Sequence, residues 1–341
     1  MASRRYLLHA EIGRGGTATV HLGTLVAEDG RTTSLVAVKR LREGFTRDMQ
    51  LVASLVDEAV LTSRIHHPNV VATLEVVSKP TDLFVVMEYV EGEALSRILG
   101  RHAEQGRQLP VPIVSAIAIG TLRGLHAAHE ARDDSGAPLH VIHRDVSPQN
   151  VMIGTDGLAH VVDFGVAKAV GRLAQTKQGQ IKGKLAYMSP EHLRGDEVDR
   201  RADVYAAGVL VWEMLVGQRL FRGKSEVEMV GAIRAGAIEP PSAKAAAYVP
   251  PALDAVVLKA LARDRADRYV DAAAMADAIA AAAPPATREE LAAWAIAETA
   301  DAVAERRAAV KAVATSPTVL TFTSSEKAFD DATTRVMHRK A

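Results

Sequence analysis

HVIHRDVSPQN, from His140 to Asn150, is the most informative segment of the sequence. In it an aspartate, Asp145, follows His143 by two residues, and Asn150 follows that aspartate by five. Asp145 can accept the proton of an attacking hydroxyl, and Asn150 offers a neutral oxygen to a metal ion. The question is whether this loop belongs to a working phosphoryl-transfer enzyme or to the remnant of one.

A second motif, VVDFG, follows at Val161–Gly165. Its Asp163 adds a carboxylate, which is the hard oxygen ligand that magnesium prefers. Phosphoryl transfer requires mainly positioning and the neutralisation of charge, and Asp145, Asn150 and Asp163 together provide both. The two motifs in this order are a specific signal for that chemistry.

Near the start, Ile12–Val20 reads IGRGGTATV, a glycine-rich turn between two strand-like runs. Such glycines let backbone N–H groups approach a triphosphate closely. Ala18 stands where a dinucleotide fingerprint has its third glycine, and a strand follows instead of a helix, so a dinucleotide fold is disfavoured. Taken alone, the turn is also consistent with an ordinary tight hairpin.

The next strand ends in VAVK, which places Lys39 on it, and a helical stretch downstream carries Glu58 within the otherwise apolar VDEAVL. A carboxylate at that position can reach back to pair with Lys39. Singly, Lys39 also fits a solvated edge residue. In order with HRDVSPQN and VVDFG, we interpret the two as an ion pair that serves nucleotide binding.

The hydrophobic pattern predicts a small β-rich lobe followed by a larger helical one. From Tyr6 to about Tyr89 short β-branched runs alternate with turns, interrupted by one helix at about 46–65, and helical periodicity dominates from Val111. After about Ala283 a double proline is followed by an alanine-rich helix. We expect Thr287 to cap that helix, with Glu290 three residues on, and the remainder to be disordered.

Composition excludes several functions. Among 341 residues, 41 are basic and 41 acidic, so no global field favours nucleic acid or a membrane surface. There is no cysteine, which rules out disulfides, thiolate zinc sites and a cysteine nucleophile. We find no signal peptide and no uninterrupted apolar run that approaches the ~20 residues of a membrane span. The expectation is a cytoplasmic protein with no nucleic-acid partner and no membrane span.

Over residues 6–283 the sequence resembles the serine/threonine protein kinases, most closely their bacterial members. The resemblance implies an α+β, two-lobed fold that binds ATP and Mg²⁺ in the cleft, with an N-lobe at about 6–90 and a C-lobe at about 91–283. Residues 284–341 would form the helix and tail. It also implies phosphorylation of serine or threonine in protein substrates, and self-association for autophosphorylation between molecules.

Carried over residue by residue, the resemblance implies a complete site. Asp145 would be the base, Asn150 and Asp163 the metal ligands, Lys39 the phosphate ligand and Glu58 its partner. Glu191, Asp203 and Arg268 would have structural roles, Glu191 pairing with Arg268 and Asp203 bracing the catalytic loop. The nucleotide-binding residues would be Ile12, Gly13, Gly15, Gly16, Val20, Ala37, Lys39, Glu58, Met87, Glu88, Val90 and Met152.

Two positions depart from the family pattern. The lysine usually found two residues after the catalytic aspartate is Ser147, and the usual threonine of the substrate-facing segment is Lys184. We interpret the pair as an exchange in which Lys184 supplies the catalytic ammonium. The alternative is that Lys184 is solvated and Ser147 is a tolerated loss. Gln149, where tyrosine kinases place arginine, argues against tyrosine specificity.

Three further expectations concern activity and control. Thr176 would be the activating phosphosite, although it also fits an exposed loop threonine without consequence. A nucleotide-binding pseudokinase acting as an interaction module is the main alternative function, supported by Ser147. A small-molecule phosphotransferase is a third hypothesis, disfavoured because the Ser189–Leu193 element that accompanies peptide docking is present.

Overall fold

The computed structural model describes residues 4–27, 31–42, 49–78, 82–164, 184–223, 225–313 and 321–324. The chain divides into two compact units. The first, here called the sheet unit, comprises Met1–His66, Val71–Val90 and Ala300–Ala341. The second, called the helical unit, comprises His67–Val70 and Glu91–Thr299. A β-rich unit and a helical unit agree with the α+β architecture predicted from the sequence.

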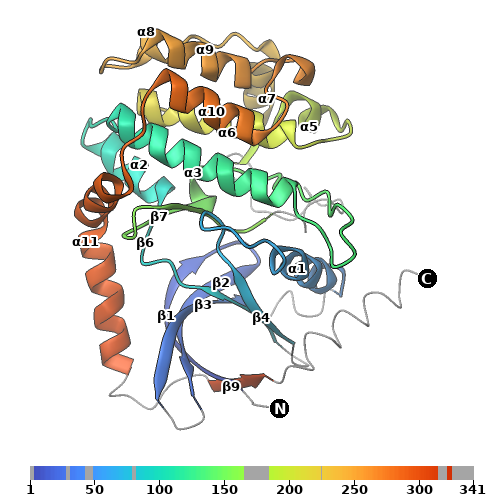
Figure 1. Cartoon of the computed structure of the whole chain (residues 1–341), viewed down its shortest axis with the longest axis vertical. Coiled ribbons are helices and arrows are strands. Elements are labelled where there is room, and N and C mark those ends of the chain that lie inside the picture. Colours follow the sequence, from blue (N-terminus) through green and yellow to red (C-terminus); the bar gives the residue numbers. More distant parts are fainter. Residues whose placement is uncertain are drawn as a thin grey trace. The chain divides into compact units, whose positions relative to one another are not determined.

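The sheet unit is built on a six-stranded antiparallel sheet with the strand order β4-β5-β3-β2-β1-β9 (Figure 1). Helix α1 (Met49–Thr62) follows β3 in the chain. The strands are β1 (Arg4–Arg14), β2 (Ala18–Val26), β3 (Thr32–Leu41), β4 (Thr73–Ser78), β5 (Leu83–Glu88) and β9 (Thr321–Ser324).

Side chains alternate between the two faces of this sheet, and the alternation decides where Lys39 lies. On one face Val36 and Val38 of β3 belong to an apolar cluster with residues of β1, β4 and β5. On the other face a second cluster joins the sheet to α1. Its buried members are Leu41, Leu55, Val56, Ala59, Val76, Leu83 and Val85. Lys39 lies two residues before Leu41 and therefore on the α1 face.

The helical unit contains most of the helices and a small three-stranded sheet (Figure 1). The strands are β6 (Gly92–Ala94), β7 (Val151–Gly154) and β8 (Ala159–Val161), with a 3-10 turn η2 (Pro148–Asn150) before β7. The helices are α2 (Leu95–Glu104), α3 (Val111–His129), α5 (Pro190–Arg194), α6 (Arg201–Val216), α7 (Glu226–Ala235), α8 (Pro241–Lys244), α9 (Pro251–Ala260) and α10 (Ala272–Ala282), and a second 3-10 turn, η4 (Arg265–Asp267), precedes α10.

Helix α6 lies at the centre of the helical unit. Every residue from Ala202 to Val216 is buried, as expected of a helix that is apolar on nearly all sides. It packs against α3, α8, α9 and α10. Two acidic side chains, Asp203 and Glu213, are buried with it, and buried carboxylates require hydrogen-bond partners. These partners define the site described below.

Helix α3 is long and apolar enough, by length and composition alone, to cross a membrane. In the helical unit it packs against α10, α6 and β8, and side chains along its length, from Ile113 to His129, are buried. These contacts account for its apolar composition within the fold.

Beyond α10 the chain continues as helix α11 (Arg288–Val313). Thr287 and Glu290 cap it reciprocally: the Thr287 N–H donates to Glu290 Oε2 at 2.8 Å, and the Glu290 N–H donates to Thr287 Oγ1 at 3.2 Å. Farther on, where composition suggests disorder, Thr321–Ser324 form β9 on the edge of β1. The segment TFTS is rich in β-branched and aromatic residues, and β1 offers it unpaired backbone groups.

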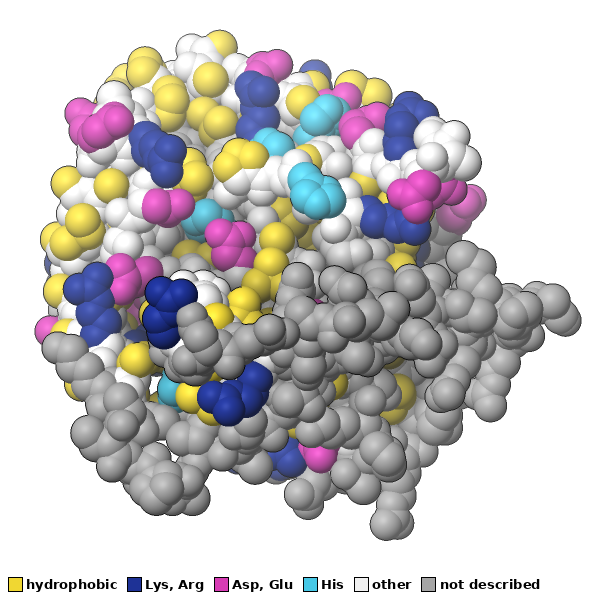
Figure 2. Space-filling model, turned by 60° about the horizontal axis from the view of Figure 1, so that its bottom comes forward, with side chains coloured by type: hydrophobic (Ala, Val, Ile, Leu, Met, Phe, Trp, Pro, Cys, Tyr) yellow, Lys and Arg dark blue, Asp and Glu magenta, His cyan; other side chains and the backbone are white. Residues whose placement is uncertain are grey.

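The surface carries charges of both signs. On the face shown in Figure 2, basic and acidic side chains are interspersed among the coloured residues. This mixture agrees with the equal totals of 41 basic and 41 acidic residues in the sequence.

Candidate active site

The glycine-rich stretch forms the turn between β1 and β2. Gly13 pairs with Val20 across the hairpin, and the Gly15 N–H donates to the Ala18 carbonyl at 2.8 Å. A Cβ added at Gly13 would meet nothing closer than 3.6 Å among the described residues, and one at Gly15 nothing closer than 3.4 Å. Internal packing therefore does not require glycine there, whereas an approaching ligand would.

Lys39 and Glu58 lie together in the sheet unit. Lys39 Nζ is 4.0 Å from Glu58 Oε1, and the two side chains are 17% and 13% exposed. The strand alternation directs Lys39 to the α1 face, and α1 presents Glu58 from its third turn. The two residues thus meet because a strand of period two packs against a helix.

The same sheet face carries several of the expected adenine contacts. Val20 pairs with Lys39 across β2 and β3, and Ala37 pairs with Met87 across β3 and β5, so these side chains share one face. All four are half-buried. Glu88 ends β5, where it pairs with Val36, and its N–H donates to the Ala72 carbonyl at 2.9 Å.

The other expected contacts are divided between the two units. Ile12 and Gly16 lie half-buried in the sheet unit, and Val90 is the last residue of its second segment. Met152, on β7 of the helical unit, is also half-buried and pairs with Ala94 and His160.

In the helical unit, the Asp203 carboxylate fixes the loop that contains His143–Asp145, here called the HRD loop. Its Oδ2 accepts from the His143 N–H at 2.8 Å and from His129 Nε2 at 2.7 Å, and its Oδ1 accepts from the Arg144 N–H at 2.9 Å. Arg144 adopts a left-handed backbone with φ 61°, rare for a residue with a side chain. Burial acts to raise the pKa of Asp203, but hydrogen bonds and the charge of neighbouring histidines bring it below its ordinary value.

The β7–β8 hairpin brings the two expected metal ligands close. Val151 pairs with Val161, so the residues that flank the ladder, Asn150 and Val162, also face each other. The Val162 N–H donates to the Asn150 carbonyl at 3.0 Å. Asp163 follows immediately, with a left-handed φ of 55° that turns the chain after the strand.

Asn150 is also tied to Asp145. Its Nδ2 donates to the Asp145 carbonyl at 2.8 Å and to Asp145 Oδ2 at 3.0 Å. These bonds fix the amide so that its oxygen is turned away from Asp145. The donor set of Asn150 oxygen and Asp163 carboxylate fits a hard divalent ion such as Mg²⁺. Within the described ranges no three His, Asp or Glu side chains form a metal cluster by themselves.

A lysine also reaches the same carboxylate. Lys184 Nζ lies 3.1 Å from Asp145 Oδ2. Ser147, two residues after Asp145, is buried at 7% exposure. Thr176 and Gly165 fall outside the described residues, so the phosphosite remains a sequence prediction.

Two of the three residues expected to be structural, Glu191 and Arg268, form an ion pair in the helical unit. Arg268 Nη1 and Nη2 donate to the two carboxylate oxygens of Glu191, both at 2.7 Å, with the side chains 0% and 3% exposed. The Arg268 guanidinium also lies over the Tyr205 ring, 4.9 Å from its centroid. Burial acts to raise the pKa of Glu191, but the hydrogen bonds of Arg268 lower it below its ordinary value.

Sequence reasoning missed a buried network on α6. The Tyr187 hydroxyl donates to Glu213 Oε2 at 2.6 Å, and Arg219 Nη1 lies 3.1 Å from the same oxygen. The signal was available: Glu213 is an acidic residue inside the apolar run VLVWEMLV. His129, at the end of the apolar helix α3, is a similar case.

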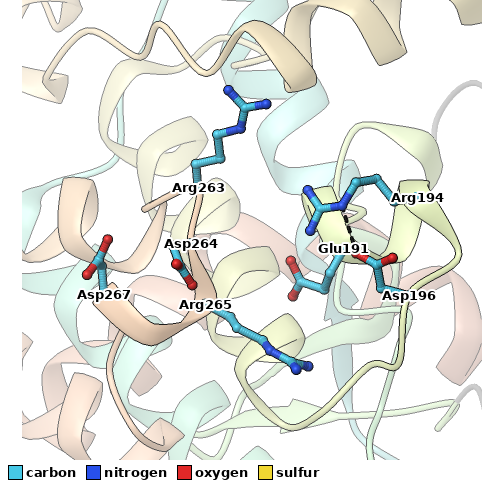
Figure 3. A pocket seen from close by; sticks show the side chains of 7 residues that line it. All are labelled: Glu191, Arg194, Asp196, Arg263, Asp264, Arg265 and Asp267. Carbon is cyan, nitrogen blue, oxygen red and sulfur yellow. Dashed lines mark hydrogen bonds and ion pairs between the residues drawn. The ribbon is translucent and has the colours of Figure 1, made fainter.

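A cavity of about 630 Å³ lies elsewhere in the helical unit (Figure 3). Glu191, Arg194 and Asp196, on and just after α5, line one side of it, and the segment Arg263–Asp267 lines the other. Arg194 pairs with Asp196 at 2.7 Å. The lining includes none of the residues expected to contact nucleotide or metal, and its opposite charges nearly balance.

Comparison with known proteins identifies the family. The family model described as "Protein kinase domain" matches residues 6–278. The chain is 38% identical over 274 residues to the tyrosine-protein kinase MasK of Myxococcus xanthus, covering 80% of this chain and 42% of MasK. It is 37% identical over 271 residues to the serine/threonine-protein kinase PknL of Mycobacterium tuberculosis, covering 80% of this chain and 64% of PknL. The chain thus spans less than two thirds of either relative.

A solved structure shares the fold. The kinase domain of Mycobacterium tuberculosis PknI, crystallised as a point mutant, matches with a TM-score of 0.59 and 24% identity. The match covers 80% of this chain and 94% of that one. It confirms the two-lobed kinase fold predicted from the sequence.

The buried Glu191–Arg268 pair yields a stability prediction. Replacing Arg268 by alanine leaves the Glu191 carboxylate buried without its partner, and we expect the free energy of unfolding to fall by about 3–5 kcal/mol. The exposed Arg194–Asp196 pair is the matched control, where Arg194→Ala should cost no more than about 1 kcal/mol. Urea denaturation of both variants measures the difference, and equal losses would contradict the assignment.

Proposed function

The chain belongs to the protein kinase family, and on that premise we propose that it transfers the γ-phosphate of ATP to serine and threonine hydroxyls of proteins. The observation that carries the proposal is the cluster in which Asn150 bonds Asp145, while Val162, the residue before Asp163, bonds Asn150 at the end of the β7–β8 hairpin. This cluster combines a base with two oxygen ligands for a metal, as phosphoryl transfer requires.

Each residue has one role in the proposed reaction. Asp145 accepts the proton of the acceptor hydroxyl. The hydroxyl oxygen forms a bond to the γ-phosphorus of ATP, and the bond between that phosphorus and the β-phosphate oxygen of the departing ADP breaks. The glycine turn and Lys39 hold the phosphates, and Glu58 orients Lys39. Asn150 and Asp163 would hold Mg²⁺, which would neutralise phosphate charge.

The pseudokinase alternative is weakened by the retained chemistry. A module that only binds partners has no physical need for the base and both metal ligands, yet Asp145, Asn150 and Asp163 are all present, and Asn150 is hydrogen-bonded to Asp145. The lack of cysteine fits a reducing, ATP-containing compartment, and we propose a cytoplasmic location.

Tyrosine transfer is a second candidate because MasK, at 38% identity, is named a tyrosine-protein kinase. Incubating the protein with labelled ATP, Mg²⁺ and a basic acceptor protein, followed by phosphoamino-acid analysis, separates the possibilities. We expect phosphoserine and phosphothreonine. Phosphotyrosine alone would favour the second candidate, and no label in any acceptor would favour the pseudokinase.

Removing the proposed machinery should abolish transfer without unfolding the chain. We expect Lys39→Met, Asp145→Asn and Asp163→Asn each to reduce the phosphorylation rate by at least about a hundredfold, because each removes a charge or base that the proposed transfer uses. Circular dichroism should show unchanged melting. Near wild-type turnover in Asp145→Asn would show that Asp145 is not the base.

We further propose that Thr176 is phosphorylated by another copy of the chain and that this activates it. Between Gly165 and Tyr187 it is the one hydroxyl-bearing residue of the sequence, and a phosphate there can pair with Arg144 and Lys168. Thr176→Ala removes the phosphate and with it one or two charge-assisted hydrogen bonds to Arg144 and Lys168. We expect this loss to lower activity by about tenfold or more. Thr318→Ala, in the tail, serves as control. Full activity of Thr176→Ala would refute the proposal.

A further inference from the structure

The ion pair between Lys184 and Asp145 joins the catalytic loop to a different segment of the helical unit. We propose that Lys184 is a catalytic residue whose ammonium neutralises charge on the transferred phosphate. We propose also that Tyr187, which Glu213 anchors, positions Lys184. This inference rests on the proposed kinase function and deepens it.

The geometry places the ammonium beside the proposed base. Lys184 Nζ is 3.1 Å from Asp145 Oδ2, and Asn150 Nδ2 donates to the same oxygen at 3.0 Å. The Lys184 side chain is 35% exposed, whereas that of Asp145 is 11% exposed. The ammonium therefore lies at the solvent edge of the carboxylate, where a phosphoryl group in line with the acceptor hydroxyl has to arrive.

The HRD loop has no cationic side chain two residues after Asp145, where the family pattern has a lysine and this chain has Ser147. Ser147 is buried, its side chain is neutral, and its carbonyl accepts from the Asn150 N–H at 2.9 Å to close the turn η2. A lysine acts as a point charge on a long flexible stem, so the same tip position is accessible from a backbone on another element.

The backbone of Lys184 is held by a hydrogen bond to Tyr187 and by the buried residues that follow it. Its carbonyl accepts from the Tyr187 N–H at 3.2 Å, and the three residues that follow Lys184 are buried. The Tyr187 hydroxyl donates to Glu213 Oε2 at 2.6 Å, and the Arg219 guanidinium lies over the Tyr187 ring at 5.6 Å. Burial raises the pKa of Tyr187, so its hydroxyl keeps the proton that it donates.

The pair with Asp145 makes the ammonium more effective late in the reaction. Before transfer the Asp145 carboxylate attracts Lys184. When Asp145 takes the proton of the acceptor hydroxyl it becomes neutral, and this attraction is lost. The ammonium then interacts mainly with the phosphoryl oxygens as the new bond forms and the bond to ADP breaks. An interaction that strengthens towards the transition state raises kcat.

Two other roles of Lys184 lead to different kinetics. If the ammonium were only a solvated surface charge, its removal would leave kcat unchanged. If it blocked the base, as an autoinhibitory contact, its removal would raise kcat. The catalytic role alone predicts a loss.

The first test is steady-state kinetics with saturating ATP and a protein acceptor. We expect Lys184→Thr and Lys184→Met to lower kcat by roughly ten- to a thousandfold, the effect of losing one preorganised stabilising group. The KM for ATP should change little, and Lys184→Arg should retain part of the rate. Lys244→Thr is the control, since Lys244 pairs with Glu239 at 2.8 Å on an exposed surface, and its kcat should equal that of wild type.

The second test is rescue. Ser147→Lys added to Lys184→Thr should restore much of kcat. Tyr187→Phe alone should lower kcat, and Ser147→Lys should rescue it too, because a lysine on the loop does not depend on Tyr187. If Tyr187 only stabilised the fold, this rescue would not occur, and its positioning role would be refuted.

The outcomes separate the two proposals. A wild-type protein that phosphorylates no acceptor refutes the kinase function and the inference with it. An active wild type with unchanged or raised kcat in both Lys184→Thr and Lys184→Met refutes the inference alone. If Ser147→Lys prevents folding, as melting would reveal, the comparison of Lys184→Met with Lys184→Arg still decides: equal rates overturn the catalytic role.

Discussion

The helical unit depends on the hydrogen bonds of one buried carboxylate. Asp203, at the start of α6, accepts two backbone N–H groups from the HRD loop and one imidazole N–H from α3. An unpaired carboxylate at that depth would be strongly unfavourable, so the loop conformation and the burial of α6 require each other. The left-handed backbone at Arg144 persists because this network determines it. The orientation of Asp145, one residue later, follows from it.

Hydrogen bonds of His143 and the pairing of β7 with β8 position the neighbouring residues of the candidate site. His143 accepts the Asp145 N–H on Nδ1 at 3.2 Å, and its Nε2 donates to the Val162 carbonyl at 3.1 Å. It thus connects the loop before β7 to the segment after β8. The hairpin between them places Asn150 opposite Val162. His143 therefore connects the proposed base, Asp145, to the segment that carries the proposed metal ligand Asp163.

Much of this could be predicted from the sequence because the motifs coincide with local structure. Strand alternation places Lys39 on the α1 face, and the S/T-x-x-E pattern at Thr287 predicts the cap of α11. What failed depends on tertiary context. The apolar run around Glu213 marks it as a buried acidic residue, but its partners Tyr187 and Arg219 could not be predicted, because only the fold brings them near. Strand β9 was missed because four residues become a strand only where an edge accepts them. The Lys184–Asp145 distance likewise depends on the packing of two distant segments, although Ser147 and Lys184 were both visible as departures from the family pattern.

Strand β9 bears on how the protein is best produced. The matched family region ends at residue 278, whereas β9 begins at Thr321 and covers the outer edge of β1. A chain shortened to the family region would expose the backbone N–H and carbonyl groups of β1 opposite Thr321–Ser324. Uncovered edges of this kind pair readily with strands of other molecules. Oligomers or aggregates of such a shortened chain would then reflect the missing strand and say little about assembly of the chain that retains it.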